Sequence, residues 1–316
     1  MPVLKTLAAI VLAAGLACAA APASTRSPLV APGVTVSGVP VGGLTAEPAR
    51  ARIERSFVRP VTIRTPDGPV HATPAQLGAA SSIDTAVSSA LAATPRSSIA
   101  LPVRLSGARV AAVVRRLARR FDRKPVDATL TGATAAGPVF TASKPGAAVD
   151  ATTMRRELAR ALRTTDRRAL RLRETVLKPR RTAESFGPVI VVVRGANSLT
   201  LYHGTKLVRR FPVATGQAIY PTPAGLWHIM DKQLDPWWYP PTYDAWAKGL
   251  KPVPPGPANP LGTRWMGLNA PGVGIHGTDE PTSIGYSASH GCIRMQVPDA
   301  EWLFEHVSVG TPVVIL

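Results

Sequence analysis

Residues 189–193 read Val-Ile-Val-Val-Val, an apolar run that is too short for a helix and rich in β-branched side chains. Such a run predicts a strand that is buried on both faces. Polar and apolar residues alternate in two segments between 198 and 213, and this spacing predicts a hairpin. Residues 227–230 and 313–316 continue the pattern. We therefore expect a mainly β domain over residues 187–316.

One stretch of this domain, residues 236–260, is too rich in Pro to form a core strand. We expect a long ordered loop there, and loops of this length are usually functional. The loop contains Trp237, Trp238 and Tyr239. These aromatic side chains belong either to the core of the β domain or to a lid that covers a substrate.

The N-terminal half contains an internal repeat. Pro-Val-His-Ala at 69–72 and Pro-Val-Phe-Thr at 138–141 each lead into Gly-Ala-Ala and then into a helical run, at a nearly constant offset. We therefore expect two α+β units, over residues 28–105 and 106–184. The fold class predicted for the whole chain is multidomain, with these two units ahead of the mainly β domain.

Each unit is expected to begin with an amphipathic helix. In the first unit, Thr45 is suited to cap a helix whose apolar stripe is Ala49, Ile53 and Phe57. The matching stripe of the second unit consists of Val110, Val113, Leu117 and Phe121.

Charge is concentrated in the middle of the chain. The 316 residues include 37 Lys+Arg and 19 Asp+Glu, which gives a formal charge of +18. Residues 101–184 hold 20 of the basic and 7 of the acidic side chains. Few aromatic residues accompany them, which argues against nucleic-acid binding. We expect a solvated helix face, or a surface with salt-sensitive attraction to anionic wall polymers.

The first residues predict export. Lys5 precedes an apolar run, 6–17, that is too short to span a bilayer, and Ala-Pro-Ala at 21–23 is a possible cleavage site. We expect a signal peptide over residues 1–23, with lipidation at Cys18 as the alternative. The exported protein would then work in the periplasm or cell wall, outside the cytoplasmic membrane, with no integral membrane segment after cleavage.

Signal removal would leave Cys292 as the sole cysteine. A lone thiol in an oxidising compartment is a candidate nucleophile, and the alternative is a small buried apolar residue. Two histidines precede it, His290 by two residues and His276 by sixteen. In an extended chain His290 would point to the same side as Cys292, whereas His276 must be brought close by a turn. An imidazolium beside the sulfur would hold it as thiolate.

The residues around the cysteine form a longer motif. Residues 287–295 read Ser-Ala-Ser-His-Gly-Cys-Ile-Arg-Met, and His276-Gly277 stands before them. Gly291 allows close approach of the backbone to a substrate and allows N–H groups to face an oxyanion. A zinc site formed by His276, His290 and Cys292 is the competing interpretation, but catalytic zinc sites rarely pack two ligands and a glycine in this way.

This motif resembles the signature of the L,D-transpeptidase (YkuD-type) catalytic domain of bacterial cell-wall enzymes, over roughly residues 187–316. Residues 33–184 are similar to the repeated peptidoglycan-binding domain found ahead of such enzymes. The resemblance implies a YkuD-like β-sandwich for the catalytic domain. Two further segments match the family, Pro-Thr-Pro-Ala-Gly at 221–225 and Asn-Pro-Leu-Gly at 259–262.

The resemblance also implies a cysteine acyltransferase reaction. Cys292 would attack the carbonyl of the diamino acid in a tetrapeptide stem, release D-Ala and leave a thioester. The amine of a second stem would then form a cross-link between two diamino acids, which contributes to cell-wall organisation and cell shape. His276 would be the general base, oriented by the carbonyl of Gly277. The partners are thus the donor tetrapeptide and the acceptor amine, and no cofactor or metal is needed.

Four other residues match positions of the family's motif. His290 and Gly291 correspond to positions beside the oxyanion site. Ser289 and Arg294 either brace the loop or bind a substrate carboxylate. Two alternatives to transpeptidation remain open from sequence: hydrolysis of the same bond by an L,D-carboxypeptidase, and a cell-wall binding protein with an idle catalytic domain.

Overall fold

The computed structural model describes residues 27–164, 167–242 and 244–316. The predicted signal peptide and Cys18 therefore lie outside the described residues. The chain divides into two compact units: Met1–Arg115 with Ala151–Leu172, and Arg116–Asp150 with Arg173–Leu316. The repeat boundaries expected from the sequence remain predictions. None of the helices in the described ranges has the length and hydropathy that crossing a membrane requires.

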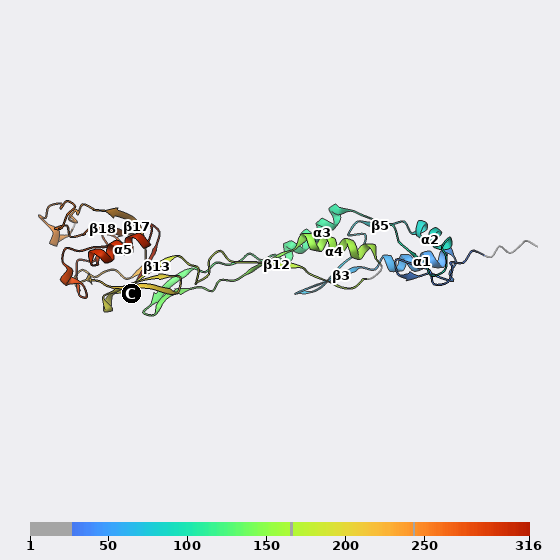
Figure 1. Ribbon diagram of the computed structural model, residues 1–316, viewed down its shortest axis with the longest axis horizontal. Helices are drawn as coiled ribbons and strands as arrows, with labels where there is room; N and C mark the ends of the chain where they lie inside the picture. The colour runs from blue at the N-terminus through green and yellow to red at the C-terminus, as the bar shows by residue number, and fades with distance from the viewer. Residues whose placement is uncertain (1–26, 165–166, 243) are drawn as a thin grey trace, which may run out of the picture. The chain divides into compact units, whose positions relative to one another are not determined.

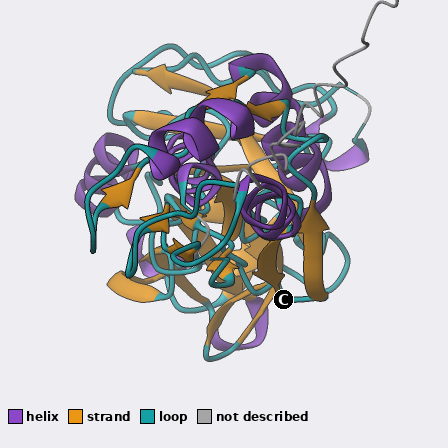
Figure 2. Cartoon of the chain, turned by 90° about the vertical axis from the view of Figure 1, so that its right-hand side faces the viewer, coloured by secondary structure: helices purple, strands orange, loops and turns teal. Residues whose placement is uncertain are grey.

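The first unit mixes helices and short strands. Figure 2 shows the helices of the chain in purple and its strands in orange. The strands of the first unit form three small sheets, with orders β2-β1-β6, β11-β3-β4 and β5-β7. Its elements are β1 (Thr35–Val36), β2 (Val39–Pro40), α1 (Ala46–Phe57), β3 (Val61–Thr65), β4 (Gly68–Ala72), β5 (Ala79–Ser81), α2 (Ile83–Leu91), β6 (Ser98–Ile99), β7 (Val103–Leu105), α4 (Ala151–Arg163), β11 (Leu170–Arg171) and the first part of α3 (Gly107–Phe121).

Helix α1 forms where its apolar stripe predicts it. Ala49, Ile53 and Phe57 are all buried, in a core that includes α2 and the strand residue Val36. Thr45 is the N-cap residue, but its side chain makes no capping hydrogen bond. In α3 the buried stripe uses Val114 rather than the expected Val113, because consecutive apolar residues leave the sequence pattern ambiguous by one position.

The second unit is mainly β (Figure 1). Its elements are β8 (Leu130–Thr134), β9 (Gly137–Phe140), β10 (Gly146–Val149), β12 (Glu174–Leu177), β13 (Pro188–Val193), β14 (Ser198–His203), β15 (Lys206–Pro212), β16 (Thr215–Gly216), β17 (Gly225–Leu234), β18 (Arg264–Leu268), β19 (Gly274–His276), β20 (Ser287–Ser289), β21 (Ile293–Arg294), α5 (Val297–His306) and β22 (Pro312–Ile315).

Eight of these strands form one sheet, with the order β15-β14-β13-β22-β17-β18-β19-β21. The predicted buried strand and the hairpin that follows it are confirmed as β13, β14 and β15. Strand β17 joins the two halves of the sheet. Its residues 225–228 pair with β22, and residues 229–234 pair with β18 beyond a break in register at Ile229/Asp231. Such a break bends a strand, so β17 turns the sheet between the two sets of strands.

One apolar core fills the space between the two halves of the sheet and α5. Side chains from β13 and β14 meet those of β18, β19 and β21, and Leu303 and Phe304 of α5 complete the cluster. The hairpin of β8 and β9 packs on the opposite face of β13, where Leu130 and Phe140 meet Val189 and Val191. That hairpin therefore belongs to the same compact unit as the eight-stranded sheet.

Candidate active site

The register of four strands arranges the site in two rows. One row crosses the sheet as Asp231–Gly267–Gly274, and the next as Gln233–Trp265–His276–Arg294. Side chains directly opposite each other, and side chains two residues apart on one strand, share a face of a sheet. The residues between these positions, Met266, Ile275 and Ile293, are buried in the core. The two rows therefore lie on the face turned away from the core.

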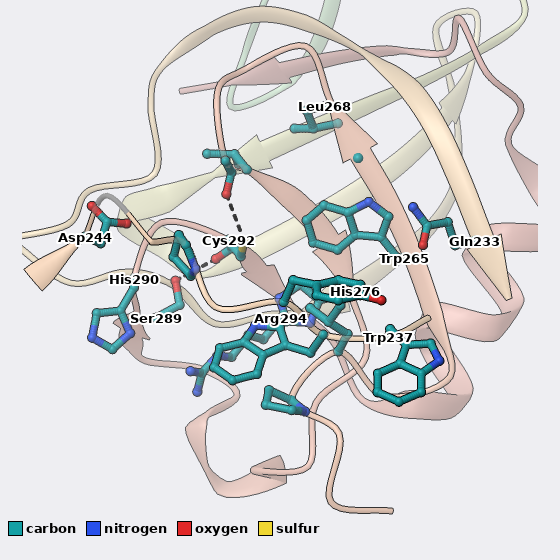
Figure 3. A pocket seen from close by; sticks show the side chains of 18 of the residues that line it. Gln233, Trp237, Asp244, Trp265, Leu268, His276, Ser289, His290, Cys292 and Arg294 are labelled. Atoms are coloured by element: carbon teal, nitrogen blue, oxygen red, sulfur yellow. Dashed lines mark hydrogen bonds between the residues drawn. The ribbon is translucent and has the colours of Figure 1, made fainter. Parts of the chain in front are cut away.

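Cys292 extends the first row. It stands one residue before β21, and Ile275 pairs with Ile293, so Cys292 follows Gly274 across the strands. A cavity of about 670 Å³ lies over this face, and Cys292, His276, Arg294 and Asp231 all line it. Figure 3 shows the labelled side chains of Cys292, His276 and Arg294 projecting from neighbouring strands.

His276 is held as a neutral base. Its side chain is 4% exposed, its Nδ1 contacts the carbonyl oxygen of Gly277, and Trp265 stacks on the ring with centroids 5.7 Å apart. A carbonyl only accepts, so Nδ1 carries the hydrogen and Nε2 keeps its lone pair. Burial lowers the pKa of His276 to about 4; the Gly277 contact opposes this shift and the positive charge of Arg294 adds to it.

The sulfur of Cys292 is also held in its neutral form. The side chain is partly buried, and Sγ lies 3.6 Å from the carbonyl oxygen of Gly272. Burial raises the pKa of this thiol above its ordinary value, while a contact with the Gly274 backbone and the charge of Arg294 act in the opposite sense. The sequence predicts a resting thiolate beside an imidazolium. The directions of both pKa shifts instead favour a thiol beside a neutral imidazole.

Ser289 braces the turn that carries the cysteine. Its Oγ donates to the carbonyl of Cys292 at 2.6 Å and accepts from the N–H of Gly291 at 3.1 Å. The side chain is 1% exposed. Gly291 has φ +113°, a conformation that side chains disfavour. Because the N–H of Gly291 is already donated to Ser289, that group does not face the cavity as a free oxyanion donor.

His290 lies away from the position that simple alternation predicts. The positive φ of Gly291 ends the extended chain between His290 and Cys292. The exposed ring of His290 packs between two aromatic rings instead, 4.0 Å from Trp246 and 5.0 Å from Tyr220 between centroids. Partial burial and the charge of Arg294 lower its pKa. His290 thus joins the Pro-rich loop to the strand that leads to the cysteine.

Arg294 is engaged by an acidic partner. Its guanidinium donates to the carboxylate of Glu280 at 2.6 Å, and the Arg294 side chain is 17% exposed. Arg294 also pairs with His276 across the strands. A cation therefore stands beside the His276 imidazole and is partly neutralised by Glu280.

The described residues of the loop, 236–242 and 244–260, include aromatic side chains that line the cavity. Trp237, Trp238 and Tyr239 all face it. Trp237 is 49% and Tyr239 67% exposed, and their rings stack with centroids 6.2 Å apart. Of the two interpretations left open by the sequence, this exposure excludes the core for Trp237 and Tyr239.

Asn259 fixes the path of this loop. Its fully buried amide donates to the carbonyls of Pro236 at 2.8 Å and Pro254 at 3.1 Å, with a longer contact to Val253 at 3.4 Å. Its oxygen accepts the N–H of Leu261 at 2.8 Å. One side chain thus ties the beginning of the loop to its end.

Asp231, Gln233 and Trp265 line the cavity but were not singled out from the sequence. They are brought to the site by strand register, which involves pairing between segments far apart in the chain. Trp246 of the loop, which the sequence leaves between core and lid like its aromatic neighbours, also lines the cavity. No group of three or more His, Cys, Asp or Glu within the described ranges is arranged to hold a metal ion.

Comparison with known proteins assigns both parts of the chain. The family model "L,D-transpeptidase catalytic domain" (YkuD) matches residues 187–315, and "Putative peptidoglycan binding domain" matches residues 71–171. The chain is 33% identical over 126 residues to "Putative L,D-transpeptidase YkuD" of Bacillus subtilis, with 40% of this chain and 64% of that protein covered. It therefore spans a little less than two thirds of that relative.

A second curated relative gives the same family. "Putative L,D-transpeptidase YqjB" of Bacillus subtilis is 33% identical over 133 residues, which covers 40% of this chain and 70% of that protein. A crystal structure of an Enterococcus faecium L,D-transpeptidase aligns with 84% of this chain and 98% of its own at 18% identity, with a TM-score of 0.37. With the YkuD and peptidoglycan-binding matches in this order, the chain belongs to the L,D-transpeptidase family.

Proposed function

We propose that the protein is a peptidoglycan L,D-transpeptidase that joins two diamino acids through a thioester on Cys292. The observation that carries the proposal is the pairing of β19 with β21, which sets the His276 imidazole and the Cys292 thiol on neighbouring strands above one cavity. The fixed Nδ1 hydrogen of His276 leaves Nε2 as the basic atom. General-base activation of a cysteine needs this arrangement.

The first half-reaction forms the thioester. Nε2 of His276 takes the Sγ proton as the sulfur attacks the carbonyl carbon of the donor's diamino acid. The C–N bond to the terminal D-Ala then breaks, and the departing amine takes the proton back from His276. We assign the N–H of Cys292 itself to the developing oxyanion, since the N–H of Gly291 is donated to Ser289.

The second half-reaction transfers the acyl group from the thioester to the acceptor. The amine of an acceptor stem loses a proton to His276 and attacks the thioester carbon. The C–S bond breaks, and the sulfur recovers the proton. Trp237, Trp238 and Tyr239 on the rim would restrict water during this step.

The test is incubation of the purified chain with tetrapeptide stems, followed by mass spectrometry. We expect cross-linked dimers that have lost one D-Ala. Tripeptides without dimers would make the protein an L,D-carboxypeptidase, and no release of D-Ala would overturn the proposal. Cys292→Ala should abolish both products, and His276→Gln should slow release by about 10²–10⁴-fold. The matched control is His228→Gln, because His228 is exposed on the same sheet.

An independent test detects the reactivity of the Cys292 thiol directly. A carbapenem-type β-lactam should acylate Cys292 by addition of the thiol to the lactam carbonyl, visible as an adduct by intact-mass spectrometry. An equal adduct on Cys292→Ala would contradict the role of this sulfur.

We also propose that the protein is exported and that its N-terminal part holds it on the cell wall. The peptidoglycan-binding match over residues 71–171 supports this, as does the exposure of the arginines of α3 and α4, Arg115, Arg116, Arg119, Arg155, Arg156, Arg160 and Arg163. Co-sedimentation with purified peptidoglycan, with and without its anionic polymers and at rising salt, separates peptide or glycan binding from charge attraction.

A further inference from the structure

We propose that Asp231 is a specificity-determining residue that binds the free ammonium group at the far end of the donor's diamino acid. This inference rests on the proposed function, in which a diamino acid carbonyl meets Cys292. It concerns another part of the same cavity, where the Asp231 carboxylate lies about two strands from the cysteine.

The position of Asp231 follows from the register. Asp231, Gly267, Gly274 and Cys292 succeed each other across β17, β18, β19 and the residue before β21. Three interstrand spacings of about 4.8 Å give roughly 14 Å between the backbones of Asp231 and Cys292. The two residues between them are glycines, and the Trp265 ring covers the second of them, since a Cβ at Gly274 would lie 2.3 Å from that ring. A ligand that joins the carboxylate to the sulfur therefore runs over the Trp265 indole.

The carboxylate occupies a prepared place. A Cβ at Gly267 would lie 2.0 Å from Oδ1 of Asp231 and 2.8 Å from Nε1 of Trp265. The absence of a side chain at Gly267 thus makes the room in which Asp231 sits beside the indole. Gln233 donates to the other oxygen, Oδ2, at 2.8 Å, which fixes the carboxylate on the cavity face.

The charge of Asp231 is not paired within the protein. No Lys, Arg or His nitrogen of the described ranges lies within ion-pair distance of it, whereas Arg294, three strands away on the same face, is paired with Glu280. Lys232, the next residue, points to the opposite face and donates to the carbonyls of Phe304 and Val307 at the end of α5. A carboxylate that lines a cavity without a cation of its own is suited to a cationic ligand.

A diamino acid is long enough to span the separation between the carboxylate and the sulfur. In a diamino acid of lysine length, six bonds of about 1.5 Å join the carbonyl carbon to the distal amine and extend over roughly 7–8 Å. An attacking sulfur stands about 3 Å from the carbonyl carbon, and an ammonium stands about 3 Å from a carboxylate. The carboxylate itself lies beside Gly267, one strand nearer to Cys292 than the Asp231 backbone, so about 10 Å separates it from the cysteine. A diamino acid of this length spans that separation in a bent conformation.

The assignment distinguishes the donor from the acceptor. The attacking amine of an acceptor must meet the thioester at Cys292, so it is at the other end of the row. Asp231 therefore selects donors whose distal amine is unsubstituted, whereas a stem already acylated at that amine would be a poor donor.

The experiment compares two donor tetrapeptides, one with a free distal amine and one with that amine acetylated. Turnover is read as D-Ala release, and binding is measured by calorimetry on Cys292→Ala protein. We expect the wild type to prefer the free amine by about tenfold to a hundredfold in kcat/KM, the range for a charge-assisted hydrogen bond. Asp231→Asn, which preserves shape, should remove this preference by slowing only the free-amine donor. Binding to Cys292→Ala should show the same preference, lost in the double variant with Asp231→Asn.

The matched control is Asp279→Asn, which removes one negative charge from the same cavity. It should retain the preference. An equal loss in both variants would mean that the net charge of the cavity attracts the amine, and would overturn the assignment. If the wild type turned over both donors equally well, the assignment of Asp231 would be overturned, while the proposed function would still stand. Preferential binding without any turnover would overturn the proposed function and leave Asp231 as an ammonium-binding residue.

Discussion

Replacing Asn259 by Ala tests whether one buried amide holds the loop that borders the cavity. The substitution deletes the hydrogen bonds to the carbonyls of Pro236 and Pro254 and the one from the N–H of Leu261. Each contributes about 1 kcal/mol net, and a buried group left without a partner costs about 1–3 kcal/mol. We therefore expect the free energy of unfolding to fall by about 3–5 kcal/mol.

The assay is urea unfolding followed by tryptophan fluorescence. All six tryptophans lie between residues 227 and 302, so the signal reports on the second unit alone. The control is Asn269→Ala, since the Asn269 side chain accepts a single hydrogen bond, from the N–H of His228; its loss should cost about 1 kcal/mol. Asn259→Asp keeps the acceptor and loses the donors, so it should be no more stable than Asn259→Ala. A loss below about 1 kcal/mol for Asn259→Ala, or equal losses at 259 and 269, would refute the reasoning.

Three further predictions concern the strands below the cavity. Gly274→Ala would place a Cβ 2.3 Å from the Trp265 ring. We expect the ring to move away from His276 and the rate of D-Ala release to fall at least tenfold. The control is Gly249→Ala, where a Cβ meets open space and which should retain activity within twofold apart from backbone strain. Burial lowers the pKa of His276 from 6.5 to about 4 in the folded state, so its neutral form contributes stability above pH 6.5 that is lost as the pH falls toward 4. In urea titrations, the difference in unfolding free energy between wild type and His276→Gln should shrink by about 3 kcal/mol over that range. A difference that does not change with pH would contradict this prediction. Glu280→Gln removes the ion-pair partner of the Arg294 guanidinium. Since the Glu280 side chain is 63% exposed, the free energy of unfolding should fall by less than about 1 kcal/mol. A larger loss in chemical denaturation would contradict this and show that the ion pair stabilises the fold as well as orienting the guanidinium.

The sequence predicts the strands well because their signal is local. The run at 189–193 and the hairpin after it need only alternation and β-branched residues to be recognised, and both form as β13, β14 and β15. The stripe of α1 is equally local, and its three apolar residues are buried. The motif from 287 to 295 identifies the family because its residue types and spacing are unusual together.

The rest of the site depends on pairing between distant segments. Asp231 and Trp265 reach the cavity through register between β17 and β18, with a break at Ile229/Asp231 that no sequence pattern marks. His290 departs from alternation because the backbone of Gly291 adopts a positive φ, which a glycine permits but does not require. The protonation state of His276 depends on how deeply it is buried, and burial follows from the tertiary fold.

The placement of β22 has a consequence for the order in which the sheet is completed. Residues 312–315 occupy the middle of the eight-stranded sheet, parallel to β13, and separate it from β17. Pairing between segments more than 120 residues apart closes late, since a long loop must be ordered first. A chain emerging N-terminus first therefore holds Cys292 beside an unfinished sheet until β22 inserts. The cavity that Cys292 lines is complete only after residues 312–315 have been delivered.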